Sequence, residues 1–230
     1  MSGLQGLPTT DSPTTPARHE AGHLLMLWLL DRYAVACIIT DEGGLTKALD
    51  DKPGEMDTPH QRILYAMAGM VLAGDFDLLN NLQQHATKPD YFDKFSDSHY
   101  TAKALPHIGG DPAWVLNQFH DIILRLGSRF RKAHRQATKL LLEKREIAFD
   151  TIHDLFCQWD AEYGLASRPK SDLVCRMIAR SFRWPMPRGR FIGWDFKPLP
   201  EGVVAPERMG MKELAEQVKR QMVNRVCSCQ

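Results

Sequence analysis

A run of seven apolar residues, 24–30, constrains the fold of this chain more than any other feature. A helix that spans a membrane needs about 20 such residues, so this run is too short to cross a bilayer. It follows Thr15, a good N-cap residue, and Pro16, which suits the first position of a helix. The sequence therefore predicts a helix over residues 16–32 that other elements bury on most of its sides.

The rest of the chain is predicted to be mainly α-helical, with one short β-hairpin directly after the buried helix. Segment 34–40, in which four of seven residues are β-branched, and segment 45–49 flank a Gly43-Gly44 turn, a pattern typical of two paired strands. Caps and helical spacing predict further helices over residues 58–74, 77–86, 96–105 and, broken into two or three pieces, 111–163.

Three regions follow from this pattern. Residues 1–15 are rich in Thr, Ser, Pro and Gly and are predicted to be a flexible lead-in. Residues 16–163 form the helical domain. Residues 164–230 form an arm, in which an irregular Arg-, Trp- and Pro-rich stretch to about residue 207 precedes a C-terminal amphipathic helix.

Charge and cysteine usage restrict the class of protein. The 29 Lys and Arg residues nearly balance 28 Asp and Glu residues, unlike a nucleic-acid binder that is basic overall. The 5 cysteines include no CxxC pair, which fits a reducing compartment better than a disulfide scaffold. The N-terminus has no basic segment followed by an apolar stretch, as a signal peptide would. We therefore expect a soluble cytoplasmic protein with no membrane partner.

The most informative motif for function is His19-Glu-Ala-Gly-His23, which lies inside the predicted buried helix. Histidines four residues apart share one face of a helix, so both imidazoles can bind a single zinc ion. The glutamate between them is then placed to take a proton from a water whose pKa the ion lowers. The motif predicts His19 and His23 as zinc ligands and Glu20 as the general base.

A catalytic zinc site needs a third protein ligand. One class of such sites has a third histidine six residues after the second, but Leu29 stands there in this chain. Glu42 lies at a plausible distance along the sequence, although in a predicted turn. The other candidate carboxylates are Asp75, Asp77, Asp93 and Asp97.

Three segments of the chain resemble the protease domain of the FtsH-type AAA+ zinc metalloproteases. These are the HEAGH motif, the extended segment that ends in Gly44-Leu45-Thr46, and a helix that carries Ala68-Gly69. The resemblance covers about residues 16–160. In that family an aspartate at the start of a later helix is the third ligand, which implies Asp97 in the pair Ser96-Asp97.

The chain also departs from the pattern of that family. Ser98 stands where an aliphatic residue is usual, and residues 71–75 lack the paired glutamates that follow the small-residue helix. No Gly-rich loop ending in Gly-Lys-Ser/Thr is present in the sequence. We therefore expect that the chain does not use ATP to unfold its own substrates.

The resemblance implies a zinc-dependent endopeptidase, built as a mainly α-helical zinc-metallopeptidase domain with a short β-hairpin next to the HExxH helix. Zinc-activated water would attack a peptide bond of an unfolded protein or peptide, or of a protein that a separate ATPase or adaptor delivers. The family also implies a homo-oligomer. The alternative is a catalytically inactive adaptor that keeps zinc, or only the fold, and binds a protein partner.

Three other features of the sequence are predicted to have structural roles and no part in catalysis or ligand binding. The basic tract over residues 125–139 is predicted to be a solvated helix face. The Arg- and Trp-rich stretch 182–194 is more typical of an arm packed against protein than of a nucleic-acid site, so no nucleic-acid partner is predicted. His99 is predicted to lie on the surface.

Overall fold

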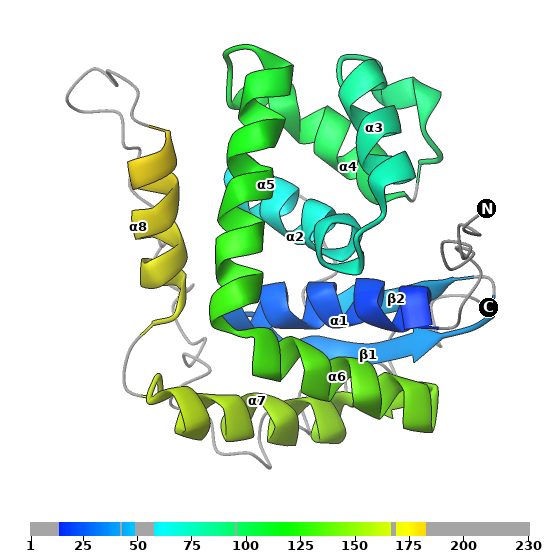
Figure 1. Ribbon diagram of the computed structural model, residues 1–230, viewed down its shortest axis with the longest axis vertical. Coiled ribbons are helices and arrows are strands. Elements are labelled where there is room, and N and C mark those ends of the chain that lie inside the picture. The colour runs from blue at the N-terminus through cyan, green and yellow to red at the C-terminus, as the bar shows by residue number, and fades with distance from the viewer. Residues whose placement is uncertain (1–13, 42, 49–57, 95, 167–168, 183–230) are drawn as a thin grey trace, which may run out of the picture. The chain divides into compact units, whose positions relative to one another are not determined.

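The computed structural model describes residues 14–41, 43–48, 58–94, 96–166 and 169–182. These residues form eight α-helices and a three-stranded antiparallel sheet (Figure 1), so the prediction of a mainly helical fold with a short hairpin is confirmed. The chain divides into two compact units, residues 1–182 and 183–230, and every described residue belongs to the first. The N-terminal lead-in up to residue 13, Glu42 and the arm beyond residue 182 lie outside the described residues.

The apolar run lies in helix α1 (Thr14–Leu29), and all residues from 21 to 30 are buried. Helices α2 and α6 and strands β1 and β2 pack against α1, as the prediction of a helix buried on most sides requires. The helix begins two residues before Pro16 and ends at Leu29, three residues earlier than predicted. Asp31 accounts for the early end, because its backbone takes a left-handed φ of 55°.

The hairpin consists of β1 (Ala34–Ile39) and β2 (Gly44–Ala48), with Cys37 opposite Thr46. A third strand, β3 (Glu146–Ala148), pairs with the other side of β1, so β2 is an edge strand. The sequence predicts helix for these residues, and this part of the prediction is wrong. The three residues of β3 carry no strand periodicity, and only the pairing with a strand far away in the sequence makes them extended.

The remaining helices are α2 (Pro59–Ala73), α3 (Phe76–His85), α4 (Asp97–Ala104), α5 (Pro112–Arg129), α6 (Arg131–Lys144), α7 (Phe149–Tyr163) and α8 (Ser171–Ser181). Local caps fix several of their ends. Thr58 and Gln61 form a capping box at the start of α2, and Gly74 ends that helix with a left-handed φ of 76°. Ser96 caps α4 through the backbone N–H of His99. These boundaries agree with the sequence prediction because the caps are local.

Helix α8 lies within the stretch that we predicted to be irregular, and this part of the prediction is wrong. Val174 and Ile178 are buried, and α8 packs against α5. At its N-terminal end Lys170 forms ion pairs with Asp31 and Asp160, at 3.1 Å each. Tertiary contacts therefore hold this segment as a helix.

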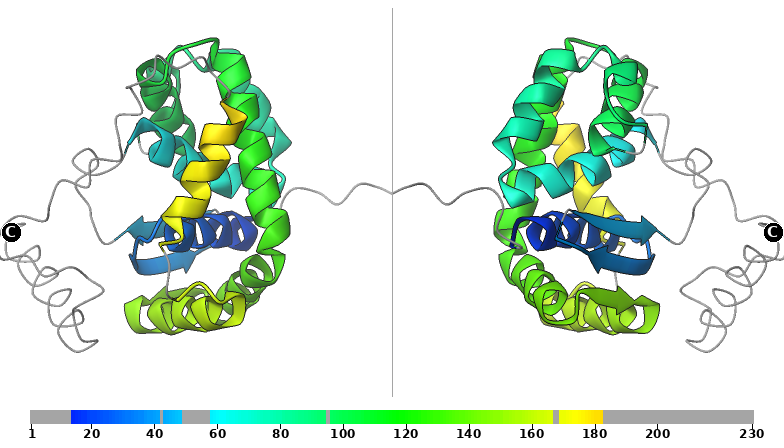
Figure 2. Two further views of the ribbon diagram at one scale, coloured as in Figure 1. Left: turned by 90° about the vertical axis from the view of Figure 1, so that its left-hand side faces the viewer. Right: turned by 90° about the vertical axis from the view of Figure 1, so that its right-hand side faces the viewer.

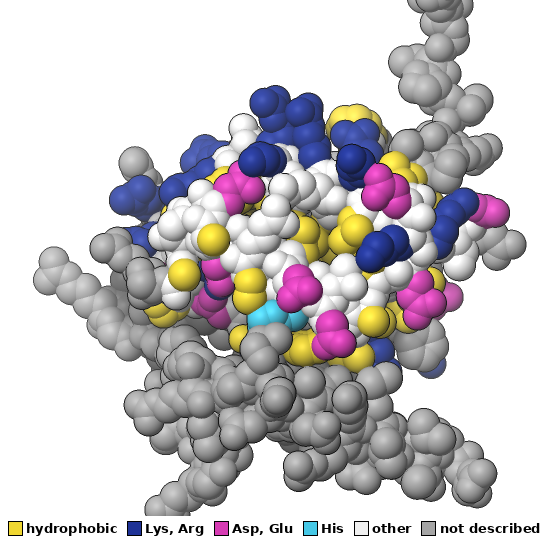
Figure 3. All heavy atoms as spheres, turned by 90° about the horizontal axis from the view of Figure 1, so that it is seen from below, with side chains coloured by type: hydrophobic (Ala, Val, Ile, Leu, Met, Phe, Trp, Pro, Cys, Tyr) yellow, Lys and Arg dark blue, Asp and Glu magenta, His cyan; other side chains and the backbone are white. Residues whose placement is uncertain are grey.

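Helix α1 and the strands form a middle layer. In Figure 1, α2 lies above α1 while α6 and α7 lie below it, and both side views in Figure 2 show the same order. The basic residues of the tract 125–139 are exposed, as predicted, and Figure 3 shows Lys and Arg side chains gathered along one edge of the lower face. Within the described residues, no helix combines the length and the apolar character that a membrane crossing requires.

Candidate metal centre

Two helices bring the four predicted site residues together. Helix α1 carries His19, Glu20 and His23, and Asp97 is the first residue of α4. The Oδ2 atom of Asp97 lies 2.8 Å from Nε2 of His19 and 3.1 Å from Nε2 of His23. The potential ligand atoms of His19, Glu20 and His23 all lie within 4.8 Å of one another. This group is therefore close enough to hold a metal ion.

The ring orientation of His23 follows from a backbone hydrogen bond. Its Nδ1–H donates to the carbonyl oxygen of Tyr65 at 2.9 Å, and the two rings pack with centroids 4.7 Å apart. In a neutral imidazole, Nε2 then carries only a lone pair, and it faces a lone pair of the Asp97 carboxylate. That contact is favourable only when a proton or another cation lies between the two atoms.

The pKa values of the metal-free cluster also favour a positive charge between His23 and Asp97. Burial lowers the pKa of His23, but the adjacent carboxylate of Asp97 outweighs this and raises it to about 9. Burial also raises the pKa of Asp97, and the neighbouring His23 and His19 outweigh it and hold that pKa far below its usual range. The cluster therefore keeps one carboxylate ionised and favours a positive charge beside it.

A zinc ion fits this donor set. Ligand atoms about 2.0–2.1 Å from a tetrahedral ion lie roughly 3.3 Å from one another, slightly more than the two distances to Asp97. Gly69 of α2 leaves the necessary space, because a Cβ there would lie 2.5 Å from Nε2 of His19 and 2.7 Å from Nε2 of His23. Two imidazole nitrogens and one carboxylate oxygen suit zinc and related divalent transition ions.

The cluster opens to solvent on one side. The side chains of His19 and Asp97 are 18% and 23% exposed, whereas that of His23 is 5% exposed. His19 and Asp97 therefore lie on the solvent side of the cluster, and His23 lies on its buried side.

Glu20 is buried beside the two histidines and is held by the sheet. Its Oε2 atom accepts a hydrogen bond of 2.6 Å from the hydroxyl of Thr46 in β2. The carboxylate of Glu20 therefore lies within the same group of potential ligand atoms as the two imidazoles.

The other candidate ligands lie elsewhere. Asp75 caps α3 through the N–H of Leu78, and Asp77 and Asp93 are exposed. Leu29 is fully buried in the core. His99, which we expected on the surface, is buried instead, and its Nδ1–H donates to the carbonyl of Pro89 at 2.9 Å. The surface prediction for His99 is therefore wrong, because the chain before α4 folds over it.

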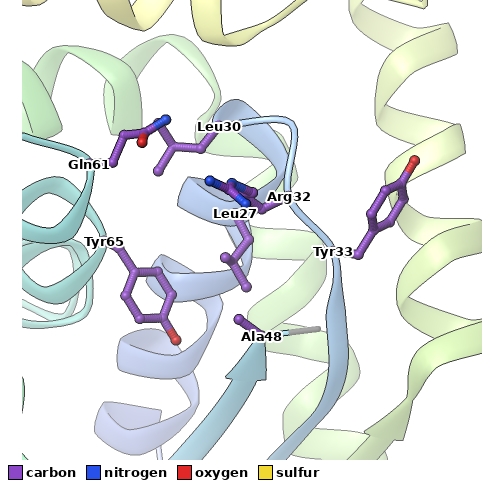
Figure 4. Close-up of a pocket in the computed structure, with 7 residues that line it drawn as sticks. All are labelled: Leu27, Leu30, Arg32, Tyr33, Ala48, Gln61 and Tyr65. Carbon is purple, nitrogen blue, oxygen red and sulfur yellow. The ribbon is translucent and has the colours of Figure 1, made fainter. Parts of the chain in front are cut away.

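Tyr65 is not among the residues predicted from the sequence, and it supports the site in two ways. Its carbonyl orients His23, and its hydroxyl donates to the backbone carbonyl of Thr46 at 3.0 Å. No sequence signal points to a residue that acts through its backbone. The ring of Tyr65 also lines a cavity of about 60 Å³ between α1, α2 and the end of β2 (Figure 4), which has room for a few water molecules.

The fold and the site together define a mainly helical protein with a small antiparallel sheet and a His19-Glu20-His23 group that can bind a metal ion. The chain matches no protein-family model and no curated protein. The geometry of the site is therefore the basis for assigning a function.

Proposed function

We propose that this protein is a zinc-dependent endopeptidase with an FtsH-type protease domain. His19, His23 and Asp97 hold the ion, and Glu20 is the general base. The observation that carries the proposal is the approach of two imidazole Nε2 atoms to Oδ2 of Asp97, beside the buried carboxylate of Glu20.

Bound zinc supplies Lewis acidity, which lowers the pKa of water at the site and polarises a peptide carbonyl. Glu20 accepts the proton that the attacking water loses, and then donates it to the nitrogen of the leaving amine. His23 keeps its orientation through the Tyr65 carbonyl, so its Nε2 stays directed at the ligand cluster. Different residues therefore bind the ion and transfer the proton.

The edge strand β2 is where we place an extended substrate. The N–H of Thr40 bonds to the carbonyl of Gly43 at 2.7 Å, so the antiparallel register turns the backbone groups of Gly44 and the N–H of Thr46 away from β1. The Thr46 carbonyl also points away from β1 and already accepts from the Tyr65 hydroxyl. A peptide that adds to this edge lies next to Glu20, since Thr46 contacts its carboxylate. Substrates are unfolded proteins or peptides, or proteins that a separate ATPase or adaptor delivers.

The test uses the full-length protein, metal analysis and cleavage of an unstructured protein such as casein. We expect about one zinc ion per chain. Glu20→Gln should keep the zinc and lower the cleavage rate by about 10²–10⁴-fold, the usual contribution of a general base. Glu143→Gln, at an exposed position of α6, is the matched control and should cleave normally.

Two outcomes would count against the peptidase. If the Glu20→Gln variant cleaves as fast as the wild type, Glu20 is not the base and the mechanism is wrong. Stoichiometric zinc without cleavage of a broad peptide library would favour the alternative function, a zinc-binding adaptor for a protein partner.

A further inference from the structure

The carboxylate of Glu20 lies directly on strand β2, against two residues that share one face of the strand. Thr46 donates a hydrogen bond to Oε2 at 2.6 Å, and a Cβ on Gly44 would lie 2.8 Å from Oε1. Residues two apart on a strand point to the same side. The hairpin therefore forms a surface that both makes room for the carboxylate and binds it.

The direction of the hydrogen bonds around Thr46 follows from counting protons. A threonine hydroxyl has one proton, and the carboxylate of Glu20 can only accept. The same hydroxyl oxygen lies 3.1 Å from Sγ of Cys37 on β1, so the thiol must donate to it. Burial raises the pKa of Cys37 to about 12, and the thiol therefore keeps its proton at neutral pH.

All three members of this chain are buried. Glu20, Thr46 and Cys37 are 3%, 7% and 0% exposed, so water cannot readily replace either hydrogen bond. The three residues also come from three different elements, namely α1, β2 and β1. The hydrogen bonds from Cys37 to Thr46 and from Thr46 to Glu20 thus tie the motif helix to the hairpin.

We propose that Thr46 is a positioning residue, whose hydroxyl fixes the carboxylate of Glu20 beside the metal ligands, and that the Cys37 thiol fixes the hydroxyl. This inference rests on the proposed function, in which Glu20 moves the proton. Within the described residues, the hydrogen bonds of the Thr46 side chain join Cys37 and Glu20 and none of the metal-ligand candidates, so Thr46 acts through Glu20. A displacement of about 1 Å in a reacting group can lower a rate by roughly 100-fold.

The first test does not depend on activity. Crystal structures of the metal-free wild type, Thr46→Val and Thr46→Ser give the position of the Glu20 carboxylate directly. We expect the carboxylate to be displaced in Thr46→Val, which keeps the shape of the side chain but cannot donate, and to be in place in Thr46→Ser. An unchanged carboxylate in Thr46→Val would overturn the proposal even if the wild type cleaves nothing.

The second test separates positioning from metal binding. Thr46→Val should lower kcat by about 10–100-fold, with KM and zinc content close to those of the wild type, and Thr46→Ser should restore most of the rate. Loss of zinc from Thr46→Val would show a structural role and overturn the inference, as would a normal kcat. If Glu20→Gln is inactive while Thr46→Val is fully active, only this inference fails and the proposed function stands.

Cys37 gives an independent check on the same hydrogen bonds. Cys37→Ala removes the donor to Thr46 and should lower kcat less than Thr46→Val does, because the hydroxyl can still donate to Glu20. Cys37→Ser keeps a donor and should cleave faster than Cys37→Ala. Equal rates for these two variants would remove Cys37 from the proposal.

Discussion

The Oδ2 atom of Asp97 lies 2.8 Å from Nε2 of His19, although 78 residues separate the two in the sequence. The contact exists because α2 packs against both α1 and α4 and so brings the first residue of α4 to the motif helix. Asp97 is therefore placed both to bind a cation and to hold the two imidazoles together.

Asp97→Asn should weaken zinc binding by more than about 100-fold. The loss of a residue that only supports a metal ligand lowers metal affinity by about 10–100-fold, so a larger effect identifies Asp97 as a ligand. The amide lacks the negative charge that offsets the ion, and the two histidines alone form an incomplete site. Metal analysis and competition with a chelator measure the effect. Asp77→Asn, at an exposed carboxylate of α3, is the control and should bind zinc normally. Normal affinity in Asp97→Asn would remove this residue from the ligand set.

Gly69→Ala should abolish zinc binding. The new Cβ would lie within 2.7 Å of Nε2 of both histidines, where it would occupy the space between their rings and α2. Gly43→Ala is the matched control, since nothing lies within 4 Å of a Cβ at that position. Zinc content is compared after circular dichroism has confirmed that both variants are folded. A folded Gly69→Ala variant that keeps its zinc would show that the cluster can shift away from α2.

The contribution of His134 to the stability of the protein should fall in mild acid. Its Nε2–H donates to the backbone carbonyl of Arg18 at 2.9 Å, and burial lowers its pKa below the ordinary value of 6.5. Below pH 6.5 the unfolded chain therefore binds a proton that the folded protein does not. His134 makes its full contribution to the free energy of unfolding above pH 6.5. This contribution decreases as the pH falls, by at most about 1.4 kcal/mol per pH unit.

Urea unfolding at pH 7.5 and pH 5.5 measures this effect. His134→Gln lacks this imidazole, whereas His23, whose raised pKa acts in the opposite direction, is present in both proteins. The free energy of unfolding at pH 5.5, relative to that at pH 7.5, should therefore be higher in the variant than in the wild type. An equal change in both proteins would mean that other groups account for the acid sensitivity.

Lys170→Met should destabilise the protein by about 1–3 kcal/mol. The Lys170 side chain is only 12% exposed and lies 3.1 Å from both Asp31 and Asp160, so its loss leaves two carboxylates without their shared cation. The control is Lys132→Met, whose ion pair with Glu162 is exposed and screened by solvent and should contribute little to stability. Thermal unfolding of the two variants compares the effects, and equal losses would contradict the assigned role of Lys170.

Local chemistry explains which parts of the fold were predictable. The helix ends at Thr58, Gly74 and Ser96 depend on hydrogen bonds within a few residues, so their positions follow from the sequence. Strand β3 and helix α8 were missed for the opposite reason. Each is held by an element that is distant in the sequence, β1 for the strand and α5 for the helix.

The half of the site that lies in the HEAGH motif follows from local sequence alone. Histidines four residues apart on a helix share a face whatever surrounds them, so His19, Glu20 and His23 needed no tertiary information. The structure decided which carboxylate meets the two imidazoles and which side chains hold the histidine and the glutamate in place. Those contacts join α1, α2, α4 and the hairpin, and they form only when hydrophobic burial packs these elements together, a long-range effect that no local pattern contains.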